Sequence, residues 1–151
     1  MKHSYTNSSY YNIRLTSRYL KLFTAQILKK YGDGISSDEI LALDIIKQYG
    51  SMCQRDLAKL LFRDRANTGK IANSLMEKGY IKINAEQKNN RLVKTISLSE
   101  EGDAFLLEVF EKCKPILNSV NAAFTYEENE QLNDMLKKLR NALTTVTEIQ
   151  I

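Results

Sequence analysis

The 151-residue chain contains no tryptophan, one proline, one histidine and two cysteines. Its histidine, His3, stands at the N-terminus, so neither a Ser-His-Asp triad, a Cys–His pair nor an imidazole metal cluster can be built in the folded body. Cys53 and Cys113 are too far apart in the sequence for a metal-binding or redox motif. These shortages predict that the protein is not an enzyme and uses no metal or cofactor.

Helix-breaking residues and long apolar runs are also scarce. One proline and six glycines in a chain that is 43% apolar favour a helical, folded protein. No apolar stretch approaches the length of a membrane span, and the N-terminus lacks the hydrophobic core of a signal peptide. We therefore expect a single cytoplasmic domain over residues 1–151.

The net charge of +4 is unevenly distributed. Residues 54–94 hold ten Lys or Arg and four Asp or Glu, whereas residues 99–151 hold five and ten. A concentrated positive segment favours a polyanionic partner such as DNA. A solvated basic surface is the alternative, and charge alone does not decide between the two.

The apolar spacing predicts a mainly α fold with a small wing of two or three β-strands. Helices are expected over about 9–31, from the Ser36 cap to Gly50, over 54–62 and over 65–78, with two long helices within 100–148. Alternating apolar residues in "YIKINAE" and "VKTISLS" predict two strands, with Asn89-Asn90 at the hairpin tip.

The stretch "RANTGKIANSLMEKG" (65–79) has a polar front and an apolar rear. "TGK" lacks the other residues of a phosphate-binding loop. A polar front half is what a helix needs to read base edges in the major groove, where Asn suits adenine and Lys suits guanine or phosphate. The predicted recognition residues are Arg65, Ala66, Asn67, Thr68, Lys70, Asn73 and Ser74.

Two further groups surround this helix. Basic side chains and helix N-termini are typical contacts of DNA phosphates, which position a protein without reading sequence. The predicted phosphate contacts are Ser36, Ser37, Gln54, Arg55, Lys59 and Arg63, and those of the wing are Lys88, Asn89, Asn90, Arg91 and Lys94.

From about residue 9 to residue 146 the chain resembles the MarR family of winged helix-turn-helix transcriptional regulators. The similarity lies in "GISSDEILALDIIKQYG", in "CQRDLAKLLFRDRANTGKIANSLMEKGYI" and in "ISLSEEGDAFL". It implies a winged-helix lobe over 36–98, with the helix-turn-helix at about 53–78 and the wing at about 80–98. It also implies a homodimer on a palindromic operator, joined through helices within 9–31 and 100–148, and a repressor that a small aromatic or phenolic ligand relieves.

The terminal helices supply a reason for dimerisation that is independent of the family. Apolar residues recur there in steps of four and three, and two such seams exceed what the core of a small domain needs. The predicted dimer residues are Leu106, Phe110, Leu117, Val120, Phe124, Leu132, Leu136, Leu139, Leu143 and Val146.

The chain departs from the family in two places. The family's wing carries Asp-x-Arg, whereas this wing reads Asn89-Asn90-Arg91-Leu92, so either Arg91 or Leu92 occupies the arginine's place. Gly69 replaces a small hydroxyl residue inside the recognition helix, which costs up to about 1 kcal/mol relative to alanine. It either lets DNA approach or is tolerated.

Three alternatives stay open from sequence. In the family, effectors bind between the dimer helices and the DNA-binding lobe, which here selects Tyr11, Leu15, Arg18, Tyr19, Leu43 and Ile46; core packing is the simpler interpretation of each. Cys53, at a helix N-terminus near Arg55, is a candidate redox switch, although a structural thiol is the more common case. A winged helix that binds protein rather than DNA is the third alternative.

Overall fold

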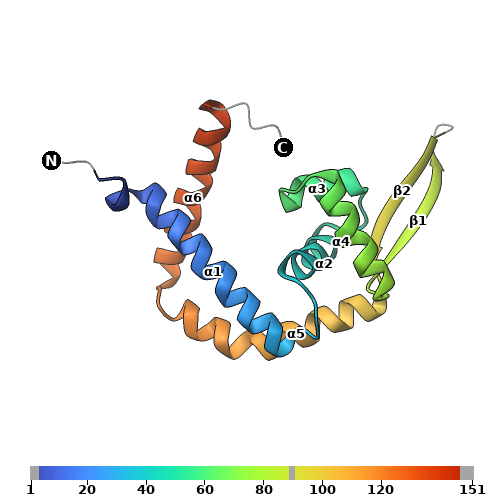
Figure 1. Ribbon diagram of the computed structural model, residues 1–151, viewed down its shortest axis with the longest axis horizontal. Coiled ribbons are helices and arrows are strands. Elements are labelled where there is room, and N and C mark those ends of the chain that lie inside the picture. The colour runs from blue at the N-terminus through green and yellow to red at the C-terminus, as the bar shows by residue number, and fades with distance from the viewer. Residues whose placement is uncertain (1–3, 89–90, 147–151) are drawn as a thin grey trace. The chain divides into compact units, whose positions relative to one another are not determined.

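The computed structural model describes residues 4–88 and 91–146, which divide into two compact units, one up to Val109 and one from Phe110 onward. The elements are shown in Figure 1. They run η1 (Tyr5–Asn7), α1 (Ser9–Tyr31), α2 (Ser37–Tyr49), α3 (Gln54–Leu61), α4 (Arg65–Glu77), β1 (Ile81–Lys88), β2 (Arg91–Leu98), α5 (Glu100–Asn121) and α6 (Tyr126–Val146). The predicted mainly α fold with a β wing is confirmed.

Side-chain caps define where the helices of the first unit begin. Ser36 and Glu39 form a complete capping box, with hydrogen bonds from Glu39 N to Ser36 Oγ (3.3 Å) and from Ser36 N to Glu39 Oε2 (2.7 Å). Asp64 caps α4 by accepting from the backbone N–H of Asn67. These local hydrogen bonds satisfy N–H groups that have no partner within the helix, which is why the sequence reveals the boundaries.

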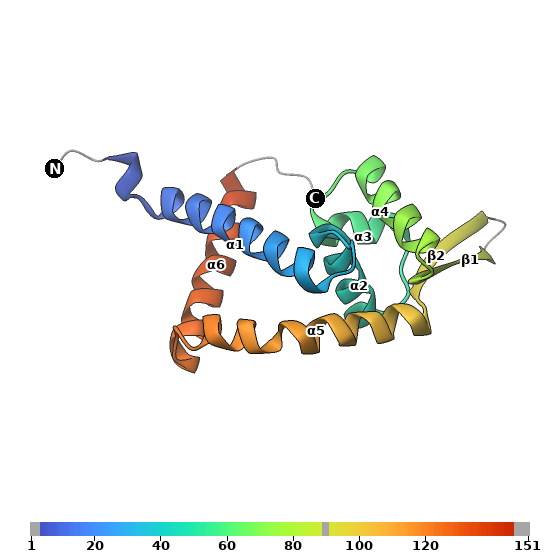
Figure 2. The same cartoon turned by 60° about the horizontal axis from the view of Figure 1, so that its bottom comes forward.

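The core of the first unit joins α2, α3 and α4 to the start of α5. Its most deeply buried side chains are Leu43, Ile46, Leu57, Leu75 and Leu106. Figure 2 shows α2, α3 and α4 gathered beside the hairpin. The prediction that Leu106 is a dimer residue is therefore wrong, because this side chain is fully buried within its own chain.

The wing is an antiparallel pair in which Ile81 lies opposite Leu98 and Lys88 opposite Arg91. This register places the turn at the predicted tip, although Asn89 and Asn90 themselves lie outside the described residues. Met52, in the link between α2 and α3, adds a single bridge to Ile96 of β2 through two backbone hydrogen bonds of 3.0 and 2.7 Å. The wing is thereby attached to the helix-turn-helix.

The second unit contains the rest of α5 and all of α6. Cys113 is buried, and burial raises the pKa of its thiol. No side chain of α6 is buried among the residues the structure describes. Apolar side chains remain exposed along both helices of this unit and in the turn between them, namely Phe110, Leu117, Val120, Phe124, Leu132, Leu143 and Val146.

Among residues 4–88 and 91–146, no helix combines the length and the apolarity needed to traverse a bilayer.

Candidate nucleic-acid interface

Helix α4 presents a polar outer face and a buried inner face. Ala72 and Leu75 face the core, whereas the front half and middle of the helix expose Arg65, Ala66, Asn67, Lys70 and Asn73. Five of the seven predicted recognition residues are thus accessible. An outer face without large apolar side chains over two turns is compatible with insertion into a DNA groove.

Two of the predicted recognition residues face the protein instead. Thr68 is fully buried and its hydroxyl donates to the Asp64 carbonyl at 2.9 Å. Ser74 is half-buried and its hydroxyl donates to Glu39 Oε1 at 2.6 Å. The prediction that Thr68 and Ser74 reach bases is wrong, because residues 68, 72 and 75 share one side of a 3.6-residue helix and Ser74 borders that side.

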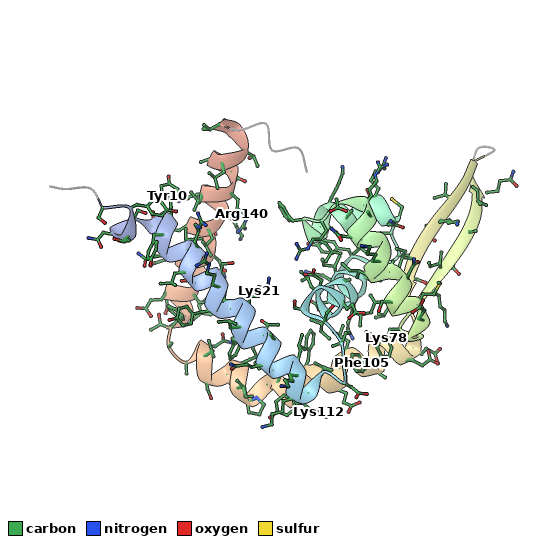
Figure 3. The ribbon with its side chains drawn as sticks, in the orientation of Figure 1. Tyr10, Lys21, Lys78, Phe105, Lys112 and Arg140 are labelled. Atoms are coloured by element: carbon green, nitrogen blue, oxygen red, sulfur yellow. The ribbon has the colours of Figure 1, made fainter. Side chains whose placement is uncertain are left out.

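A buried carboxylate connects the start of α2 to the rear of α4. Glu39 is only 5% exposed, and it accepts from Ser36 N, from Ser74 Oγ and from Lys78 Nζ at 2.7 Å. Figure 3 labels Lys78, which follows the last turn of α4. Burial raises the pKa of Glu39, but the hydrogen bonds from Lys78, Ser74 and Ser36 outweigh it and lower the pKa to about 2. Glu39 is therefore ionised at neutral pH and holds the rear of α4.

The front of α4 is held by Gln54. Its Nε2 donates to the carbonyl of Arg65 at 3.0 Å, and a Cβ placed on Gly69 would lie 3.1 Å from the same nitrogen. Gln54 was predicted as a phosphate contact, but the structure gives its amide nitrogen a partner inside the lobe. Gly69 is explained by this contact, because a glycine at this position leaves room for the Gln54 side chain.

Cationic side chains lie around this helix. Arg63 pairs with Asp38 of α2 at 2.9 Å, and Arg55 lies 3.6 Å from Asp56. Lys59 is exposed. These exposed ion pairs leave guanidinium donors that a phosphate can use, since each arginine carries five N–H groups. Ser37 is exposed as well, whereas the N–H of Ser36 donates to Glu39 in the capping box and its hydroxyl oxygen accepts from Glu39 N.

The wing is described only in part. Lys94 is exposed on β2, and Leu92 is 67% exposed. The backbone places Lys88 and Arg91 next to the tip, but their side chains lie outside the described part, as do Asn89 and Asn90 entirely. The choice between Arg91 and Leu92 as the wing's groove residue therefore stays a prediction.

Residues 35–93, which contain the helix-turn-helix and most of the wing, match the model of the MarR family. The helix-turn-helix and most of the wing are thus similar to the MarR family. The fold extends over nearly the whole chain, since the S. aureus MepR–DNA complex aligns with a TM-score of 0.76 and 22% identity, covering 93% of this chain and 99% of MepR.

Two further solved structures show the same fold. NadR in complex with 4-hydroxyphenylacetate has a TM-score of 0.73 and 19% identity, covering 92% of this chain and 94% of NadR. Bordetella bronchiseptica BpsR, whose DNA binding is regulated by 6-hydroxynicotinic acid, has a TM-score of 0.74 and 16% identity, covering 93% and 98%. No curated protein matches the chain. The chain thus shares its fold with these three solved structures.

The effector pocket predicted from the MarR resemblance is not assembled as one site. Tyr11, Leu15 and Arg18 line a hollow of about 180 Å³ together with Tyr5 and Arg14. Tyr19 is exposed and does not line it, and Leu43 and Ile46 are buried in the core. Leu43 and Ile46 therefore do not line this hollow, and Ile46 borders a separate one of about 550 Å³ between α2 and the start of α5.

The candidate redox residue, Cys53, has an acidic neighbour. Cys53 precedes α3 and its thiol donates to Asp56 Oδ2 at 3.0 Å, which lowers the pKa of Asp56. Reactive thiolates are favoured by adjacent cations, whereas a carboxylate accepts the thiol hydrogen here. Among the described residues, no three His, Cys, Asp or Glu side chains gather as metal ligands would.

Proposed function

We propose that this protein is a dimeric, sequence-specific DNA-binding transcriptional regulator. The observation that carries the proposal is the exposed polar front of α4, where Asn67, Lys70 and Asn73 are accessible while the buried face is fastened to the lobe. Residues 54–94, which include this helix and the wing, hold six more cationic than anionic side chains. Sequence-specific DNA binding needs both features, because exposed polar groups read the bases and positive charge attracts the phosphates.

In the proposed complex, different side chains have different tasks. Arg65, Lys59, Arg55 and Arg63 bind phosphates, while Asn67, Lys70 and Asn73 read base edges. Two copies of α4 occupy successive major grooves about 34 Å apart on a palindromic operator. A change in the separation of the two helices would then change operator affinity.

Exposed apolar side chains support the proposed homodimer. Leu28 is the only buried residue of the 23-residue α1 among the described residues, and α6 buries none. Helices of this length gain most of their stability from packing an apolar face, so these faces need a partner. A second copy, joined through α1, α5 and α6, is the partner that the MarR fold indicates.

We also propose that the protein is a cytoplasmic repressor relieved by a small aromatic or phenolic acid. The hollow beside Tyr5 and Tyr11 supports this proposal, because it combines aromatic rings with the guanidinium groups of Arg14 and Arg18. NadR binds 4-hydroxyphenylacetate and BpsR responds to 6-hydroxynicotinic acid, so fold relatives recognise this class of compound.

Binding to duplex DNA tests the proposal. The protein's own upstream DNA and a scrambled duplex of equal composition are titrated across a series of salt concentrations. We expect stronger binding to the natural sequence and a salt slope set by the number of phosphate contacts. A steep slope with equal affinity for both duplexes would show non-specific binding alone. Failure to bind either duplex at low salt would leave a winged helix that binds protein.

Two variants separate reading from positioning. Asn67→Ala is expected to cost about 1–3 kcal/mol on the natural duplex and little on the scrambled one, whereas Arg65→Ala weakens both. Equal effects of Asn67→Ala on the two duplexes would show that this residue does not read a base.

A further inference from the structure

We propose that Asp64 is a positioning residue that orients the side-chain amide of Asn67 to read an adenine in the major groove. The inference rests on the proposed DNA-binding function and adds to it the identity of one base and the residue that selects it.

Asp64 holds Asn67 by two hydrogen bonds. Its Oδ1 accepts from the backbone N–H of Asn67 at 2.8 Å, which is the helix cap. Its Oδ2 lies 2.6 Å from Asn67 Nδ2, which is a second bond that the cap does not need. Hydrogen bonds from Asn67 lower the pKa of the Asp64 carboxyl group, first the backbone bond and then the side-chain bond. Asp64 is therefore a carboxylate and acts only as an acceptor.

An acceptor beside the amide decides which way the amide points. The nitrogen and oxygen of an asparagine amide are similar in size and are distinguished by their hydrogen-bond partners. A carboxylate oxygen accepts from the NH₂ group and repels the amide oxygen, so a flip of the Asn67 side chain about its last bond is disfavoured. Asn67 is thus held in one orientation although its side chain is exposed.

The groups left over on Asn67 match adenine. One N–H is used by Asp64, which leaves one donor and the Oδ1 acceptor without a partner among the described residues. In the major groove adenine offers N7 as an acceptor and the N6 amino group as a donor. Guanine offers two acceptors, cytosine a donor and thymine an acceptor with a methyl group. Only adenine pairs with both remaining groups of Asn67.

The hydrogen bond between Asp64 and the Asn67 side chain, called the tether below, lowers the entropy cost of binding a base. The Asp64 charge also weakens binding to DNA of any sequence. A side chain that is already ordered loses less freedom when it contacts a base. The Asp64 carboxylate stands at the front of the recognition helix, where it repels DNA phosphates of any sequence. The pair therefore favours specificity at the expense of general affinity, and the bond from Asn67 Nδ2 is the part that a helix cap alone does not supply.

The test uses adenine analogues and the full-length protein. Each adenine of the upstream duplex is replaced in turn by 7-deazaadenine, which lacks the N7 acceptor. For the wild-type protein we expect one adenine in each half-site where replacement weakens binding by about 5- to 150-fold. Asp64→Ser keeps a good helix cap but has no carboxylate for the side chain of Asn67. In this variant, replacing that adenine by 7-deazaadenine should hardly change the affinity, so the penalty becomes nearly onefold. The affinity for a scrambled duplex should stay equal or rise.

Controls separate the tether from folding. Asp64→Asn is a second variant that retains capping ability without the charge, and it should behave as Asp64→Ser does. Glu77→Gln, which removes an exposed carboxylate from the other end of α4, should leave the penalty at the selected adenine unchanged. The side-chain NH₂ signals of Asn67 in ¹⁵N-resolved NMR report the tether without DNA, and they should shift on Asp64 substitution.

Three results would overturn the inference. They are a wild-type protein that tolerates 7-deazaadenine at every position, Asp64 variants that retain the full adenine penalty, and Asn67 NH₂ signals that do not respond to Asp64. Absence of binding to any duplex by the wild-type protein would instead reject the proposed function together with the inference.

Discussion

The Ser74 hydroxyl of the recognition helix α4 donates a 2.6 Å hydrogen bond to Glu39, the residue that completes the capping box of α2. Glu39 also accepts from Lys78 just beyond α4, while Arg63 just before α4 pairs with Asp38. The first turn of α2 thus holds α4 from both sides. Because the contacts of Glu39 lie at the inner face of α4, they stabilise the position of the helix and leave Asn67 and Lys70 accessible.

Acid should weaken the fold through Glu39. Its pKa is about 2 in the folded chain and 4.5 as the ordinary value, so the ionised carboxylate stabilises the fold. This contribution, on the order of 3 kcal/mol, is complete above about pH 5 and is lost as the pH falls through 2. In Glu39→Gln the free energy of unfolding should fall at pH 7 and vary less between pH 5 and pH 2. Chemical denaturation across this pH range measures both effects.

Ser74→Ala serves as the control for the same network. It removes one hydrogen bond but leaves the ion pair with Lys78, so it should cost about 1 kcal/mol and retain most of the pH dependence. Identical acid profiles for the wild type and Glu39→Gln would show that Glu39 contributes nothing to acid sensitivity.

Gly102→Ala should be strongly destabilising. A Cβ at this position would lie 2.1 Å from the carbonyl oxygen of Tyr80, and this backbone already accepts a hydrogen bond from Ser99 N. Tyr80 also stacks on Phe105 of α5, with ring centroids 4.4 Å apart. Phe105 is labelled in Figure 3. Because backbone cannot move aside cheaply, we expect a loss of about 3 kcal/mol in urea unfolding. A loss below 1 kcal/mol would contradict this close approach.

The same substitution at Gly69 should behave differently. The atom facing a new Cβ is the end of the Gln54 side chain, which can shift by a few tenths of an ångström. Alanine also favours the helix by up to about 1 kcal/mol, so Gly69→Ala should be neutral or stabilising in thermal unfolding. In a Gln54→Ala background, where the Gln54 side chain no longer faces the new Cβ, Gly69→Ala should stabilise the protein more than it does in the wild type. A loss of stability in both backgrounds would refute the explanation of Gly69.

Replacing Phe62 by asparagine should stabilise the fold. It ends α3 in the left-handed conformation (φ 53°) with a side chain that is 65% exposed. A bulky residue pays a steric cost there that asparagine largely avoids. Phe62→Asn should therefore raise the free energy of unfolding by about 0.5–1 kcal/mol. Leu60→Asn, in the right-handed backbone of the same helix, is the control and should yield no gain.

Charge on the α6 seam should break the proposed dimer. Leu132 is 37% exposed in the single chain, and Leu132→Asp would bury a carboxylate in the subunit interface. We expect sedimentation to show two 17.3-kDa chains for the wild type and one for the variant. The neighbouring exposed change Asn133→Asp should stay dimeric. A monomeric wild type would remove the dimer from the proposal.

The sequence predicted the elements well because their signals are local. The capping partners Ser36 and Glu39 are three residues apart, as are Asp64 and Asn67, and the hairpin alternates over a few positions. Such patterns depend on neighbours within one turn or one strand pair. The order of helices, the two-stranded wing and the helix-turn-helix were therefore visible without the fold.

The directions of individual side chains depended on tertiary contacts. Ser74 is a small polar residue of the type that contacts bases, yet its hydroxyl donates to Glu39, which lies 35 positions earlier in the sequence. Thr68 and Leu106 are likewise buried in the core of the lobe, and the side chain of Gln54 lies next to Gly69.

The amino-acid sequence by itself thus determined which segments are helices and strands, where they begin and which lobe carries the positive charge. Only the tertiary structure decided which polar residues of α4 remain available to DNA. The physical reason is that a polar residue at the border of a helical face is stable either in water or against a buried partner. Such partners as Glu39 lie far away in sequence and are brought close only by packing.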